Sequence, residues 1–172
     1  PDSMNDMKIL VFAPFYPPHI GGVEFFSRDL HKNLHDMGGV EITVFTPRLP
    51  NDTDPFEKNA EANIIRFPAW EIIHNYPLPK YCPFFWTLGF WRSFRSLWKE
   101  QPDIIISHTR FFNTSLLALV YAKVRKIPLV HIEHGASFVQ SGNPIIMWMA
   151  KAYDQTIGRL ILKKADRVIA IS

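Results

Sequence analysis

The sequence predicts an α/β domain with a Rossmann-like, doubly wound and mostly parallel sheet of about six strands. Short apolar runs recur along the chain, and most are continuous rather than alternating, as in strands that are buried on both faces of a parallel sheet. Helical stretches lie between these runs, which favours βαβ units with right-handed crossovers. The chain has 172 residues, 47% hydrophobic and 20% charged, which suits one such domain over residues 4–172.

Six segments have the character of strands. They cover residues 8–13, 41–46, 63–67, 103–107, 129–133 and 167–172. Their lengths of five or six residues are typical of buried strands in α/β domains. The stretch 47–59 between the second and third of them lacks an apolar run, and we expect it to be a long surface loop.

Three helices are expected between the strands. In the first, apolar side chains at positions 23, 26, 30 and 34 form one stripe, and Gly38-Gly39 supplies the stop. Asn113 or Thr114 is expected to cap the second, which runs through Ala122 and ends before Pro128. Gly142-Asn143-Pro144 is expected to open the third, which runs to about Lys164.

The region 84–99 predicts a further, amphipathic helix. Arg92, Arg95 and Lys99 lie on one side of the helical wheel. On the opposite side, one arc holds Phe90, Trp91, Phe94, Leu97 and Trp98. The simpler interpretation is a crossover helix that packs its apolar stripe on the sheet. The alternative is contact with anionic lipid, because residues 80–99 carry four basic and no acidic residues among many aromatic rings.

Composition excludes several classes of protein. A lone Cys82 cannot form an internal disulfide, and the lack of a CxxC or Cys/His pattern predicts a metal-free protein of a reducing compartment. No apolar run approaches the roughly 20 residues that span a bilayer, so we expect a cytoplasmic protein. A net charge of +3 is too small to predict a nucleic-acid partner. Asp52 and Asp54 have metal-ligand spacing, but they lie in the expected surface loop, and we interpret the match as chance.

The clearest chemical signal is a pair of adjacent glycines, Gly21-Gly22, between the first strand and the first helix. Glycine permits close approach of a ligand to the backbone, and free N–H groups at a helix N-terminus attract phosphate or carboxylate. Ligands of open α/β sheets bind beyond the carboxyl ends of the strands, which is where this turn lies. The spacing is neither a GxGxxG fingerprint nor a Walker A loop, which weakens NAD and ATP interpretations.

Four segments, in order, resemble family 4 glycosyltransferases of the GT-B fold. Residues 8–24 are similar to that family's opening, in which a first strand leads into a proline-rich loop, Gly-Gly and a glutamate. Residues 101–108 resemble its P-D-hydrophobic-H strand. Residues 128–135 resemble its strand that leads to a histidine, and 164–172 its closing A-D-x-V-I-A-x-S strand. The resemblance covers most of the chain. It implies the acceptor-side half of a two-domain enzyme, and the nucleotide-sugar domain with its E-x7-E glutamates is expected to lie outside this sequence.

The resemblance also implies roles for individual residues. Gly21 and Gly22 would approach the donor diphosphate, and His134 would lie beside the transferred sugar. Candidates for binding the acceptor are His19, Glu24, His108, Arg110 and Gly135. Alternatives stay open for each, since Gly21-Gly22 can be a tight turn, Glu24 a first-turn carboxylate that favours the helix dipole, and the others loop residues.

The activity implied is transfer of a sugar, with retention of configuration, from a nucleoside diphosphate sugar and without a bound metal. The acceptor is expected to be a polysaccharide or a lipid-linked molecule, and a location on the inner face of the membrane would suit the latter. The 172 residues alone are expected to be inactive. Two alternatives remain: a nucleotide-sugar epimerase of GT-B fold, which the Gly-Gly-Val-Glu loop disfavours, and a non-catalytic sugar or nucleotide-binding module.

Overall fold

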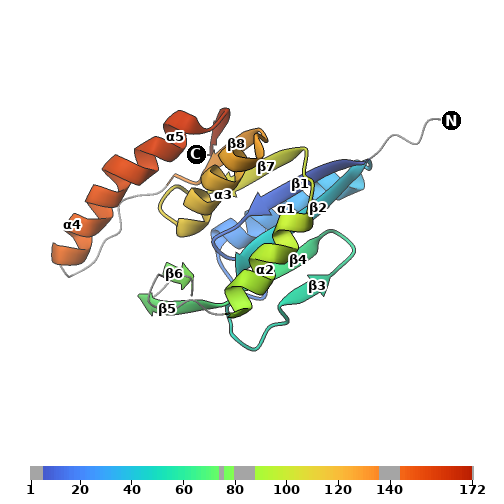
Figure 1. Cartoon of the computed structure of the whole chain (residues 1–172), viewed down its shortest axis with the longest axis horizontal. Coiled ribbons are helices and arrows are strands. Elements are labelled where there is room, and N and C mark those ends of the chain that lie inside the picture. The colour runs from blue at the N-terminus through green and yellow to red at the C-terminus, as the bar shows by residue number, and fades with distance from the viewer. Residues whose placement is uncertain (1–5, 74–75, 80–87, 136–143, 172) are drawn as a thin grey trace.

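The computed structural model describes residues 6–73, 76–79, 88–135 and 144–171 (Figure 1). Cys82, the start of the predicted amphipathic helix at 84–87 and the Gly142-Asn143 helix opening lie outside the described residues. No helix within the described ranges is long and apolar enough to cross a membrane.

The main element is a sheet of seven strands in the order β3-β4-β2-β1-β7-β8-β9. Six are parallel and coincide with the six predicted segments. They are β1 (Met7–Phe12), β2 (Val40–Pro47), β4 (Asn63–Phe67), β7 (Ile104–His108), β8 (Leu129–Glu133) and β9 (Arg167–Ala170). Taken alone, they have the 3-2-1-4-5-6 order of a Rossmann sheet, so the direction of winding reverses between β1 and β7. The predicted fold class is confirmed.

The prediction of a surface loop over 47–59 is wrong in one respect. This stretch contains the edge strand β3 (Phe56–Lys58), which runs antiparallel to β4. All three residues of β3 are exposed, so the strand has no apolar run by which the sequence could reveal it. A separate two-stranded hairpin, β5 (Ala69–Ile73) and β6 (Tyr76–Pro79), follows β4 and was also not predicted.

Helices cover both faces of the sheet (Figure 1). On one face α1 (Gly22–Asp36) shares a core with Ile9 and Val11 of β1. Three residues of its predicted stripe enter this core, namely Phe26, Leu30 and Leu34. On the other face, Leu10 and Phe12 share a core with α2 (Leu88–Lys99), α3 (Asn113–Arg125) and α5 (Arg159–Lys164). Alternate residues of β1 therefore enter two different cores, which explains why its sequence is continuously apolar.

The helix ends differ in detail from the predictions. Gly38 and Gly39 follow α1 with φ of 75° and 70°, as its expected glycine stop requires. Phe112, not Asn113 or Thr114, is the N-cap of α3 and makes no side-chain cap bond. The same helix runs through Ala122 and ends before Pro128 as predicted, because Lys126 in the left-handed conformation sets its end.

The third predicted helix is divided into α4 (Pro144–Tyr153), the π-helical segment η1 (Asp154–Gly158) and α5, which ends at Lys164 as expected. A π-helical segment interrupts the regular i to i−4 bonding, and such segments often occur at functional sites. In Figure 1 the three segments form one rod, and α4 is the end that projects from the sheet.

Candidate functional site

The predicted chemical residues gather at what we call the carboxyl edge, the segments that follow β1, β7 and β8. Because β1, β7 and β8 are adjacent and parallel, their carboxyl ends meet at the same side of the sheet. The winding reverses between β1 and β7, and open α/β sheets bind ligands at such a point. Topology alone thus brings together segments that are more than 100 residues apart.

The Gly21-Gly22 turn forms the N-terminus of α1. Gly21 is the N-cap in an extended conformation, and none of the described side chains caps the free N–H groups of the first turn. A Cβ on Gly22 would meet nothing within 4 Å, whereas one on Gly21 would collide with the carboxylate of Glu24. The turn therefore has an open side at Gly22 and a filled side at Gly21.

Glu24 and His19 form a pair beside this turn. The Glu24 side chain is buried, and its Oε1 accepts a hydrogen bond from Nδ1 of His19 at 2.5 Å. The His19 ring stacks on Phe15 at a centroid distance of 4.3 Å, and Phe15 in turn meets Phe112 edge-on at 5.5 Å. This aromatic series connects the segment after β1 to the one after β7. The first-turn position of Glu24 also matches the alternative in which its carboxylate favours the helix dipole.

His108 and His134 are brought into direct contact. Nδ1 of His108, at the end of β7, lies 2.9 Å from Nε2 of His134, which follows β8. His108 is fully buried, while His134 is partly exposed. Phe26 of α1 packs edge-on against both rings, at 6.3 Å from His108 and 4.9 Å from His134. The first helix, which begins at the glycine turn, therefore also contacts His134.

Burial keeps both rings neutral at pH 7. Desolvation lowers the pKa of His108 far below its ordinary value, and the neighbouring His134 lowers it further. Desolvation also lowers the pKa of His134, against an opposing effect of Glu133. Two neutral imidazoles share one proton in their hydrogen bond, so His134 is held by a hydrogen bond rather than by charge.

A second set of polar side chains lies behind this pair, and the sequence analysis missed most of it. Its members form a chain of contacts from the sheet to the π-helical segment: Ser107 Oγ to His131 Nδ1 at 2.8 Å, His131 Nε2 to Glu133 Oε2 at 3.2 Å, Arg110 to Glu133 at 3.0 Å, and Arg110 Nε to Asp154 Oδ1 at 2.6 Å. Burial raises the pKa of Glu133, but hydrogen bonds from His131 and Arg110 outweigh it and lower the pKa below its ordinary value. Glu133 is therefore an anion at pH 7.

Arg110 was a candidate for binding the acceptor, but its guanidinium is already bound by carboxylates of the protein. Its side chain is 18% exposed, and its guanidinium pairs with both Glu133 and Asp154. Gly158 lies against it, since a Cβ there would come within 3.4 Å of the Arg110 side chain. Arg110 thus fixes the π-helical segment to the carboxyl edge. The only sequence signal for this set was His131-x-Glu133, whose period of two places both side chains on one face of β8.

Gly135 follows His134 at the carboxyl edge, whereas the predicted basic residues of α2 lie elsewhere. Gly135 has φ of +55°, so the chain does turn there in a conformation that favours glycine. The basic residues Arg92, Arg95 and Lys99 are exposed on α2, away from the carboxyl edge. The interpretation of α2 as a helix that packs its apolar stripe on the sheet is confirmed, because Phe90 and Leu97 are buried in the core.

Within the described residues no three His, Cys, Asp or Glu side chains gather as a metal site.

Comparison with known proteins gives consistent similarities. The model of Glycosyltransferase Family 4 matches residues 20–172. An uncharacterized glycosyltransferase from Methanocaldococcus jannaschii is 39% identical over 171 residues, which is 98% of this chain and 43% of that protein. A sucrose-phosphate synthase from Thermosynechococcus elongatus has a similar fold, with a TM-score of 0.62 and 16% identity over 96% of this chain and 42% of its own. The chain thus spans less than half the length of the relatives it matches.

Proposed function

The chain belongs to glycosyltransferase family 4, with the GT-B type of α/β domain, and from this premise we propose that it is the acceptor-side half of a retaining enzyme that uses a nucleoside diphosphate sugar. The observation that carries the proposal is the meeting of the glycine turn, through Phe26 of α1, with the His108–His134 pair at the carboxyl edge. The transfer breaks the bond between the anomeric carbon and the donor diphosphate and forms one to an acceptor hydroxyl. The acceptor proton leaves with the diphosphate.

In this proposal the glycine turn receives the donor diphosphate. The uncapped N–H groups at the start of α1 carry the positive end of the helix dipole, and the open side at Gly22 gives a phosphate access to them. Such groups can stabilise charge that develops on the leaving phosphate without a metal ion. The carboxylate of Glu24 is nearby, and the N–H of His19 satisfies it in part.

His134 is proposed to hydrogen-bond the transferred sugar. Nε2 of His108 is buried without a hydrogen-bond partner among the described residues. A buried N–H without an acceptor costs more free energy than a buried lone pair without a donor. The favoured arrangement therefore has the His108 proton on Nδ1, which donates to Nε2 of His134. His134 then carries its own proton on Nδ1, as a donor to a sugar hydroxyl.

For the acceptor we propose the neighbouring surface of the carboxyl edge, with His19 and Gly135 as contacts and a lipid-linked or polysaccharide acceptor. Glu24 and Arg110 support this surface through their bonds to His19 and Glu133. His108 acts there through His134, because its ring is fully buried. We also propose that turnover requires a second, nucleotide-sugar domain. The relatives that this chain matches over less than half of their length support such a requirement.

The test uses the full-length chain, meaning these 172 residues together with the proposed nucleotide-sugar domain, and screens it against nucleotide sugars. Release of nucleoside diphosphate reports turnover, and NMR gives the anomeric configuration of the product. Replacement of His134 by alanine is expected to lower kcat by roughly 100-fold or more. His35→Ala, an exposed histidine of α1, is the matched control and should be unchanged. Wild-type turnover by His134→Ala would remove this residue from the site, and an inverted product would overturn the retaining mechanism.

A further inference from the structure

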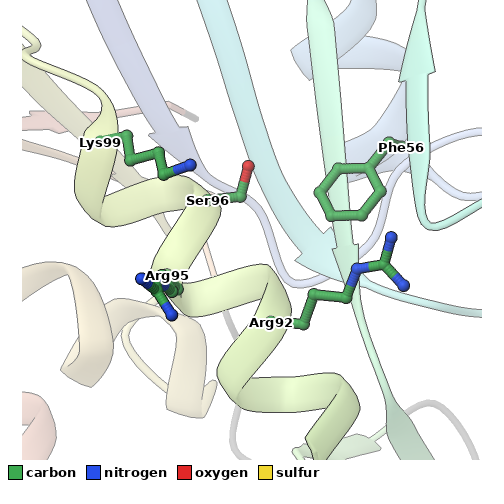
Figure 2. Close-up of a pocket in the computed structure, with 5 residues that line it drawn as sticks. All are labelled: Phe56, Arg92, Arg95, Ser96 and Lys99. Atoms are coloured by element: carbon green, nitrogen blue, oxygen red, sulfur yellow. The ribbon is translucent and has the colours of Figure 1, made fainter.

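A hollow of about 260 Å³ lies between α2 and β3, on a part of the domain that the proposed transfer does not use (Figure 2). It is lined by Phe56 of β3 and by Arg92, Arg95, Ser96 and Lys99 of α2. The four helical residues follow a spacing of three, four and seven from Arg92, so they form one stripe along the helix. Figure 2 shows Arg92 and Ser96 directed toward the Phe56 ring, with the Lys99 ammonium beside Ser96.

The positive charges of this hollow have no opposite charge beside them in the part of the chain that the structure describes. All three basic residues are exposed, and no acidic side chain pairs with them in the described parts of the chain. The acid nearest in sequence to Phe56 is Glu57, and its Oε2 is already bound by Arg66 at 2.6 Å. Arg66 is almost fully buried, and its charge balances that of Glu57. Glu57 therefore does not neutralise the basic residues of α2.

The opposite wall of the hollow helps to order one cation. The guanidinium carbon of Arg92 lies 5.8 Å from the centroid of the Phe56 ring, within the range of a cation–π contact. Such a contact restricts the side chain while leaving its N–H donors free to bind an anion. A guanidinium, a second guanidinium, an ammonium and a hydroxyl around one hollow provide the donors that phosphate oxygens require.

We propose that this hollow is a binding site for a phosphate group, separate from the donor site at the carboxyl edge. The group can come from the headgroup of an anionic lipid or from a soluble phosphate. The exposed Trp91 and Leu88 on the same helix favour the lipid, because aromatic and aliphatic side chains beside basic residues suit the interface of a membrane. The proposal does not depend on the glycosyl transfer.

The experiment has two arms, which separate the two sources of phosphate. In one, the protein is sedimented with vesicles of phosphatidylglycerol and phosphatidylcholine, or of phosphatidylcholine alone, at low and high salt. In the other, inorganic phosphate is titrated into isotope-labelled protein, and the amide NMR shifts of α2 and β3 are followed. Binding in either arm at the stripe supports the site and identifies the source.

Two triple variants provide the decisive comparison. Arg92→Gln, Arg95→Gln and Lys99→Gln together lower the net charge from +3 to 0, and so do Arg159→Gln, Lys163→Gln and Lys164→Gln on the exposed surface of α5. The α2 triple is expected to weaken binding by roughly 100-fold, since each basic residue near an anionic surface contributes about 1 kcal/mol. The α5 triple is expected to bind nearly as the wild type does.

Equal losses in both triples would show that only overall charge matters and would overturn the site, as would no binding in either arm. Circular dichroism checks that the variants fold, which is expected because all six side chains are exposed. A soluble acceptor should be glycosylated at the wild-type rate by the α2 triple. Failure of the phosphate site is thereby distinguished from failure of the proposed function, which the His134 variant tests.

Discussion

The carboxyl edge and the basic stripe of α2 both contain arginine, but the two regions use it in opposite ways. Arg110 at the edge is largely buried and bound by Glu133 and Asp154. Arg92 on α2 is exposed and lies over the Phe56 ring, and no carboxylate in the described ranges pairs with it. The edge therefore commits its charge to holding structure, whereas the stripe leaves its charge for a ligand. The same residue type is a structural element in one place and a binding element in the other.

The largest expected effect separates these two arginines by stability. Arg110→Met should lower the free energy of unfolding by about 3 kcal/mol, because it leaves two partly buried carboxylates without their cation. Arg92→Met should change it by no more than about 0.5 kcal/mol, as for most surface substitutions. Urea denaturation of both variants measures the difference. Similar values for the two would contradict the contrast between the regions.

The next effect concerns how the edge positions His134. His108→Ala should lower kcat of the full-length chain by about 10- to 100-fold with little change in the KM for donor, because His134 loses its hydrogen bond. His108→Asn should restore much of the loss, since its amide nitrogen can replace Nδ1. The double variant with His134→Ala should be no slower than His134→Ala alone. Additive losses would show that His108 acts independently of His134.

Acid sensitivity should arise from the buried histidines and not from α2. Burial lowers the pKa of His31 from 6.5 to about 4, and its Nδ1 bonds the Tyr16 hydroxyl at 3.2 Å. Between these pKa values the unfolded chain binds a proton that the folded chain does not, so stability falls as the pH is lowered from 7 to 5, by about 2 kcal/mol from this residue. Urea denaturation of His31→Gln at both values should show a smaller difference. An unchanged pH dependence would exclude His31 as its source.

The smallest effect distinguishes the two adjacent glycines. Gly21→Ala should destabilise the fold by about 1 kcal/mol, because its Cβ would displace the buried Glu24 carboxylate. Gly22→Ala should be neutral or slightly stabilising, since its Cβ enters open space at the start of a helix. In the full-length chain a bulkier Gly22→Val should raise the KM for donor while the fold remains intact. Thermal unfolding compares the alanine pair, and equal shifts would contradict the filled and open sides of the turn.

The sequence by itself determined the layers of this protein. Continuous apolar runs predicted each of the six parallel strands, and the 3.6-residue period predicted both α1 and the basic stripe of α2. These features are local, because a side chain's face follows from the period of its own element. The glycine turn and the histidine after β8 could be predicted for the same reason, since each follows a strand that the sequence pattern reveals.

Only the tertiary structure decided which of these residues meet. The contact of His108 with His134, the connection from Arg110 to the π-helical segment at Asp154, and the addition of Phe56 to the α2 stripe all join segments far apart in the sequence. A helical wheel places Arg92 on one face of α2, but it does not predict that Phe56 lies opposite. The exposed strand β3, which contains Phe56, has no apolar pattern in the sequence. Strand order and side-chain packing set these distances, and neither is encoded in the period of any single element.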